Sequence, residues 1–94
     1  MIIQHKQIGG RGMFYVGRDG AILAELVYSK PADNKMIIEH TKVDDSLTGK
    51  GLGLQLVHTA IEYARTHQMK IIPLCPFAKS VFDKKVEYRD VLAD

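Results

Sequence analysis

The chain has 94 residues, 46% of them hydrophobic and 26% charged, which is the composition of one globular domain spanning residues 1–94. The formal net charge of +2 is spread along the chain without a basic block, so nothing indicates a nucleic-acid partner. The only cysteine, Cys75, excludes an intrachain disulfide, and no apolar run approaches the roughly 20 residues of a membrane span. We therefore expect a cytoplasmic domain with no membrane partner.

The first third of the chain predicts β structure. Two β-rich runs, 13–16 and 21–28, flank Gly17-Arg18-Asp19-Gly20, and Asp-Gly between such runs favours a hairpin turn. A second turn cluster at 29–34 leads to a predicted strand over 35–43. Strict alternation in that strand would place Met36, Ile38 and His40 on one face, with Ile37, Glu39 and Thr41 on the other.

The pattern changes to a helical period from Gly51 to about Gln68. Six apolar residues form one stripe over this segment: Leu52, Leu56, Val57, Ala60, Ile61 and Ala64. The short apolar run 70–75 then predicts a strand. A strand, a helix and a strand in this order favour a crossover between parallel strands. Pro73 indicates that the later strand is paired on one side only at that point.

A second helix is predicted to begin at Pro76, because proline is favoured at the first helical position, and this makes Cys75 the N-cap. Residues 87–92 read as a short closing strand. The predicted order is therefore β-β-β-α-β-α-β. The predicted class is α/β (α+β), with a mixed sheet whose antiparallel N-terminal strands precede a β-α-β crossover.

Three glycines surround the start of the long helix, namely Gly49, Gly51 and Gly53. Glycine inside a helix costs about 1 kcal/mol relative to alanine, so this cluster needs a reason. One reason is a phosphate ligand, because the first helical amides lack intrahelical partners and the positive end of the helix dipole favours an anion. The other is structural, a turn from strand to helix that requires close packing. Spacing alone leaves both interpretations open.

The segment from Val43 to Gly53 resembles the acetyl-coenzyme A motif of the GNAT superfamily of N-acetyltransferases, which reads Gln/Arg-x-x-Gly-x-Gly/Ala. Gly51 and Gly53 match its glycines, whereas Thr48 stands in place of Gln or Arg. The chain is more closely similar to a short GNAT-like family with a Glu-His-Thr strand, a glycine loop and a Cys-Pro pair. Here these are Glu39-His40-Thr41, the loop, and Cys75-Pro76, and the resemblance covers residues 13–92.

The resemblance implies a GNAT-like fold in which the third predicted strand and the strand ending at Cys75 splay apart to admit acetyl-coenzyme A. It implies that the cofactor contacts Thr41, Lys42, Val43, Thr48, Gly49, Lys50, Gly51, Leu52, Gly53, Leu54, Pro76 and Phe77. It also implies catalytic roles for His40 and Cys75. We note no spacing typical of metal ligands.

General chemistry is compatible with those two roles. A thiol at a helix N-terminus has a lowered pKa, and a histidine on an adjacent strand could accept its proton, giving an acetyl-cysteine intermediate. Alternatively, His40 could deprotonate an incoming ammonium group for direct attack on the thioester. The plainer interpretations are a buried apolar cysteine and a core histidine. We expect the other three histidines, His5, His58 and His67, to be surface residues.

Three functions remain open from the sequence. The first is an acetyltransferase acting on an amine or protein acceptor, the second a non-enzymatic acyl-coenzyme A sensor, and the third an interaction domain with a structural glycine loop. Full-length GNAT enzymes carry two helices between their first strands that build the acceptor side, whereas residues 17–20 leave room only for a turn. We expect a monomer or weak dimer.

Overall fold

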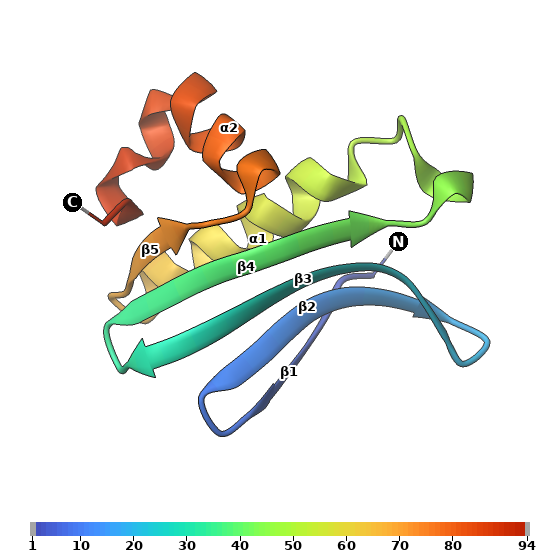
Figure 1. The fold of residues 1–94 in the computed structure, drawn as a ribbon, viewed down its shortest axis with the longest axis horizontal. Helices are drawn as coiled ribbons and strands as arrows, with labels where there is room; N and C mark the ends of the chain where they lie inside the picture. Colours follow the sequence, from blue (N-terminus) through green and yellow to red (C-terminus); the bar gives the residue numbers. More distant parts are fainter. Residues whose placement is uncertain (1, 94) are drawn as a thin grey trace.

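The computed structural model describes residues 2–93, which form a mixed five-stranded sheet and two α-helices (Figure 1). The strands are β1 (Gln4–Ile8), β2 (Arg11–Arg18), β3 (Ala21–Ala32), β4 (Lys35–Val43) and β5 (Lys70–Pro73), and the helices are α1 (Leu52–Thr66) and α2 (Pro76–Lys84). Two 3-10 helices, η1 (Asp45–Leu47) and η2 (Val86–Val91), complete the chain. The strands follow sequence order, and only β4 and β5 run parallel. The predicted mixed sheet and crossover are confirmed.

The structure differs from the prediction at two elements, one of which was missed and the other misassigned. Strand β1 was not predicted, because its five residues are all exposed and carry no apolar alternation. Residues 87–92 were expected to be a strand but lie mainly in η2, and only Leu92 makes a β-bridge, to Ile71. The Arg65 guanidinium on α1 donates to the Glu87 carbonyl and the Asp90 carboxylate, which holds this segment in a helical turn.

Helix α1 covers one face of the sheet, and all six apolar residues of its predicted stripe are buried. They pack in one core cluster with the inward residues of the central strands, among them Phe14, Leu26 and Tyr28. In Figure 1 this helix lies behind the sheet and α2 lies beside β5. We call the opposite face, which is turned toward the viewer and which none of the helices in residues 2–93 covers, the open face.

The predicted turn at Asp19-Gly20 is confirmed, and it joins β2 to β3. Both residues have positive φ, 53° and 81° respectively, as the two central residues of a type I′ hairpin turn require. Asp-Gly is favoured there because both residue types tolerate the left-handed region.

Strand β4 contains a bulge that changes which face its residues occupy. Val27 pairs with His40 but the next residue, Tyr28, pairs with Ile38, so Glu39 is an extra residue on β4. Before the bulge Met36 and Ile38 face α1. After it, Thr41 shares the buried face with its partner Leu26, whereas His40 lies on the open face. The alternation expected from the sequence, with His40 beside Met36 and Ile38, was therefore wrong.

The same point marks the divergence of β4 and β5. Their pairing ends at Ile38 and Pro73, and the Ile38 carbonyl accepts bonds from both Leu74 N and Cys75 N, at 3.1 and 3.2 Å. Beyond Ile38, β4 continues to Val43 while the other chain turns into α2. The expected splay of parallel strands is confirmed, although β5 ends at Pro73 rather than Cys75.

The packing of Tyr28 against Gly12 yields a stability prediction. A Cβ atom on Gly12 would overlap the ring and hydroxyl of Tyr28, which is fully buried. We expect Gly12→Ala to lower the free energy of unfolding by about 1–3 kcal/mol, as overpacking does. Urea unfolding measures the change. Gly10→Ala is the control, because its Cβ would make only a 3.5 Å contact with a carbonyl oxygen. Equal stabilities of the two variants would contradict the prediction.

Candidate functional site

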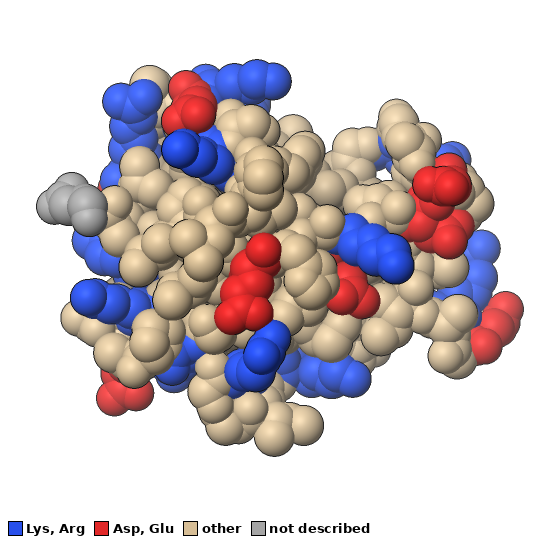
Figure 2. All heavy atoms as spheres, viewed as in Figure 1, with Lys and Arg blue, Asp and Glu red and all other residues tan. Residues whose placement is uncertain are grey.

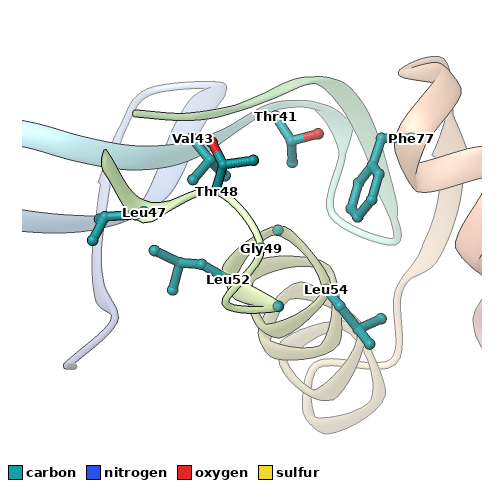
Figure 3. Close-up of a pocket in the computed structure, with 10 residues that line it drawn as sticks. Thr41, Val43, Leu47, Thr48, Gly49, Leu52, Leu54 and Phe77 are labelled. Atoms are coloured by element: carbon teal, nitrogen blue, oxygen red, sulfur yellow. The ribbon is translucent and has the colours of Figure 1, made fainter. Parts of the chain in front are cut away.

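A cavity of about 420 Å³ opens where β4 has separated from β5, between that strand and the N-terminus of α1. Its lining is mainly apolar and consists of Thr41, Val43, Leu47, Thr48, Gly49, Gly51, Leu52, Gly53, Leu54 and Phe77 (Figure 3). Leu54 and Phe77 leave 37% and 42% of their surface exposed. Large apolar side chains exposed beside a cavity of this size are typical of a small-molecule site.

Most of the residues predicted to hold a cofactor line this cavity, the exceptions being Lys42, Lys50 and Pro76. Lys42 pairs with Glu25, so its side chain lies on the open face. Leu47 also lines the cavity and was not predicted to do so. It is the one apolar residue among the polar residues 44–48, it is buried in η1, and that isolated apolar position was the available signal.

The N-terminus of α1 presents unpaired donors at the cavity. The first intrahelical bond runs from Gln55 N to Gly51 O, so the amides of Leu52, Gly53 and Leu54 precede it. Gly51 is the N-cap and makes no side-chain cap bond, and the first turn holds no acidic residue. These three amides, at the positive end of the helix dipole, can bind an anionic group.

The glycines of the loop have conformational reasons as well. Gly49 and Gly51 have φ values of 84° and 71°, in the left-handed region that only glycine adopts freely. A Cβ on Gly53 would lie 3.1 Å from the Phe77 ring, so glycine allows α2 to pack against the start of α1. The structural interpretation of the glycines is thus supported, and the same geometry leaves the helix amides open toward the cavity.

Cys75 is the N-cap of α2, as predicted, and its partner is Thr41. The Thr41 Oγ1 and Cys75 Sγ atoms lie 3.1 Å apart, and Thr41 lines the cavity while the thiol lies buried behind it. Burial raises the pKa of the Cys75 thiol, but hydrogen bonds from Thr41 and from the α2 amides of Ala78 and Phe77 outweigh it. The pKa of Cys75 is therefore lower than that of an ordinary thiol.

His40 is not a core histidine and does not contact Cys75. Its Nε2 lies 2.9 Å from Glu25 Oε2, and the two side chains are 53% and 25% exposed on the open face. Thr41 and Cys75 are hydrogen-bonded on the other side of β4. The structure therefore does not bring together the histidine–cysteine pair expected from the sequence, because the bulge turns His40 away.

The other three histidines lie at the surface, and each contacts a tyrosine. His5 Nε2 lies 2.7 Å from the Tyr28 hydroxyl, His58 Nδ1 lies 3.0 Å from the Tyr88 hydroxyl, and His67 stacks on Tyr63. Within residues 2–93, no group of three histidine, cysteine, aspartate or glutamate side chains could hold a metal ion. None of the helices in the same residues is long and apolar enough to cross a membrane.

The Thr41 contact predicts how the Cys75 thiol titrates. Thr41→Val removes a hydrogen bond that lowers the thiol pKa, so we expect the variant thiol to ionise at higher pH than the wild type. Thiolate absorbance against pH measures this cleanly, because Cys75 is the only cysteine. Ser80→Ala is the control, since its hydroxyl bonds the Phe77 carbonyl on the same helix. An unchanged Thr41→Val titration would contradict the assignment.

Comparison with solved structures shows the same fold in acetyltransferases. A GCN5-like protein from Staphylococcus aureus, solved by NMR, is 38% identical, with a TM-score of 0.74 over 96% of this chain and 87% of its own. The ribosomal-protein-S18-alanine N-acetyltransferase of Escherichia coli is 16% identical, with a TM-score of 0.66 over 83% of this chain and 53% of its own.

A GNAT family acetyltransferase of Elizabethkingia anophelis, solved with acetyl-CoA bound, is 15% identical, with a TM-score of 0.62 over 82% of this chain and 53% of its own. The chain thus spans about half the length of these two enzymes, and those two similarities show the fold alone. No curated protein sequence matches the chain. The sequence model of the GCN5-related N-acetyl-transferase family matches residues 13–91. The chain therefore belongs to the GCN5-related N-acetyltransferase family and is an acetyltransferase by family.

Proposed function

We propose that this protein transfers the acetyl group of acetyl-coenzyme A to a primary amine, carried by a small molecule or a protein. One observation carries the proposal. The three unpaired amides of Leu52, Gly53 and Leu54 lie at a mainly apolar cavity that opens where β4 and β5 diverge. A ligand with a pyrophosphate at one end and an extended apolar arm matches both parts of this site.

We place acetyl-coenzyme A in the site by matching each part of the molecule to the groups it would contact. Its pyrophosphate accepts hydrogen bonds from the α1 amides, with Lys50 beside them in the loop. Its pantetheine arm runs along Thr41–Val43, where β4 has lost its β5 partner and its backbone can pair with an extended ligand. Leu54 and Phe77 cover the arm. Thr48, in place of Gln or Arg, offers only a short hydroxyl, so the backbone supplies most of the phosphate contacts.

The positions of His40 and Cys75 favour direct transfer. His40 on the open face takes a proton from the acceptor ammonium, and the free amine attacks the thioester carbon. The C–S bond then breaks, and the leaving sulfur takes a proton from the Thr41 hydroxyl, which the Cys75 thiol replaces. The new amide nitrogen loses its second proton to solvent, and solvent returns a proton to the Cys75 thiolate. A thiol with a lowered pKa is a suitable donor for this step. The acetyl-cysteine route requires the thiol to pass Thr41, because Cys75 is buried.

A free thiol such as Cys75 persists in a reducing compartment, so the proposal includes a cytoplasmic location. A second function, non-enzymatic sensing of acyl-coenzyme A, is favoured by one observation. The turns at residues 9–10 and 19–20 join β1, β2 and β3 tightly, and neither carries a helix that would build an acceptor pocket. The sensor keeps the cavity and the amides but requires neither His40 nor Cys75.

Ligand binding is tested by an amide NMR titration of labelled protein with acetyl-coenzyme A. We expect the largest shifts at 42–43, 49–54 and 75–77, because these residues surround the proposed donor. S-acetylpantetheine, which lacks the pyrophosphate, is the matched probe, and we expect it to shift Thr41–Val43, Leu54 and Phe77 but not Gly49–Gly51. Absence of loop shifts with acetyl-coenzyme A at millimolar concentration would overturn the proposed donor site.

Catalysis is tested by release of coenzyme A thiol with a panel of primary amines and lysine peptides. We expect His40→Ala to lower kcat about 100-fold, since general base catalysis contributes at least that much, with acetyl-coenzyme A affinity unchanged. We expect Cys75→Ser to lower kcat less than His40→Ala does, because a thiolate is a good leaving group and solvent can protonate it in place of the Cys75 thiol. An inactive Cys75→Ser variant, together with an acetyl adduct on wild-type Cys75, would instead support the acetyl-cysteine route. A wild-type rate equal to the uncatalysed rate with every amine would favour the sensor.

A further inference from the structure

We propose that Glu25 is a positioning residue for His40, so that the two side chains form a proton-accepting pair on the open face. The inference rests on the proposed function of His40 as the base. Glu25 Oε2 lies 2.9 Å from His40 Nε2, within hydrogen-bonding distance. The resemblance assigned a role to His40 and none to Glu25, which is 15 residues away on another strand.

The bulge creates this contact. In the ladder between β3 and β4, Glu25 pairs with Lys42 and Val27 pairs with His40, so Glu25 and His40 are diagonal neighbours on one face. In a regular strand, with Glu39 paired and no bulge, position 40 would continue the inward face of Met36 and Ile38, away from Glu25. Glu25 is the less exposed partner, at 25% against 53%, so the carboxylate is the fixed member of the pair.

The contact determines which imidazole nitrogen is free. An ionised carboxylate only accepts hydrogen bonds, so the bonded Nε2 of His40 carries its proton. In neutral histidine the remaining nitrogen, Nδ1, then holds the lone pair. The proton of the acceptor ammonium moves to Nδ1, its N–H electron pair stays on the amine nitrogen, and Glu25 stabilises the imidazolium that results. Solvent removes the proton afterward, because His40 is half exposed.

The surroundings of Glu25 differ from those of Glu39, the other carboxylate near His40. A small hollow of about 130 Å³ is lined by Glu25, Lys42 and Asp44 with residues 22–24, so two further charged groups lie near Glu25. Glu39 instead pairs with the Arg11 guanidinium at 2.8 Å. Figure 2 shows acidic and basic side chains interspersed over the open face rather than gathered by sign. Glu39 is therefore a matched control, a carboxylate of the same face that holds a different partner.

The kinetic test uses Glu25→Gln, Glu25→Asp and Glu39→Gln in the coenzyme A release assay. We expect Glu25→Gln to lower kcat roughly tenfold, a part of what general base catalysis contributes, with KM for acetyl-coenzyme A unchanged. Glu25→Asp should recover part of the loss, and Glu39→Gln should match the wild type. In a His40→Ala background, Glu25→Gln should cause no further loss. The proposal would be overturned if Glu25→Gln lowered kcat by the same factor in the His40→Ala background as in the wild-type background, or if it did not lower kcat in the wild-type background at all.

A second measurement does not depend on turnover. The ring ¹⁵N shifts of His40, at a pH where the imidazole is neutral, report which nitrogen carries the proton. We expect a single Nε2–H tautomer in the wild type and in Glu39→Gln, and a mixture in Glu25→Gln. Identical tautomer mixtures in all three proteins would refute the positioning role. A wild type that shows the single tautomer but acetylates no amine would instead refute the proposed function and leave the pair intact.

Discussion

The bulge at Glu39 is the constraint on which the rest of the site depends. It lies where β4 stops pairing with β5, and it reverses the facing of the residues that follow at the point where the sheet opens. Thr41 and Val43 come to line the cavity, and His40 comes to the open face beside Glu25. A regular strand would place His40 on the buried face, where an imidazole without a partner is costly.

In the proposed donor site, one set of residues serves both folding and binding. Gly49 and Gly51 allow the backbone to turn from η1 into α1, and Gly53 admits the Phe77 ring from α2. These requirements also remove the side chains that would cap or cover the first amides of α1. The unsatisfied donors inherent to any helix N-terminus are thereby kept for a ligand, and the residues required by the fold are the same as those required for binding.

Polar groups elsewhere stabilise the frame around this opening. The Tyr28 hydroxyl, whose pKa burial and the nearby Tyr63 raise to about 12, bonds His5 and so ties the polar edge strand β1 to the core. Arg65 ties η2 to α1 through Asp90 and the Glu87 carbonyl. Among the described residues, no buried side-chain nitrogen or oxygen lacks a hydrogen-bond partner.

The sequence by itself determined the elements whose signals are local. The helix α1 stripe, the Asp19-Gly20 turn, the Cys75-Pro76 helix start and the glycine loop each depend on residues within a few positions of one another, and all four were predictable. Strand β1 was missed because its residues alternate in neither exposure nor polarity, and η2 was misassigned because Arg65, a distant residue, holds it.

Only the tertiary structure decided the partners of His40 and Cys75, the two side chains with proposed catalytic roles. A bulge depends on how two strands pair, and residues 35–43 contain no local signal for an extra residue. Prediction from alternation alone therefore put His40 on the wrong face. The contacts of Cys75 with Thr41 and of His40 with Glu25 join residues 34 and 15 positions apart. Sequence motifs therefore pointed to His40 and Cys75 as candidate residues, and the register of β3, β4 and β5 determined which side chains each of them contacts.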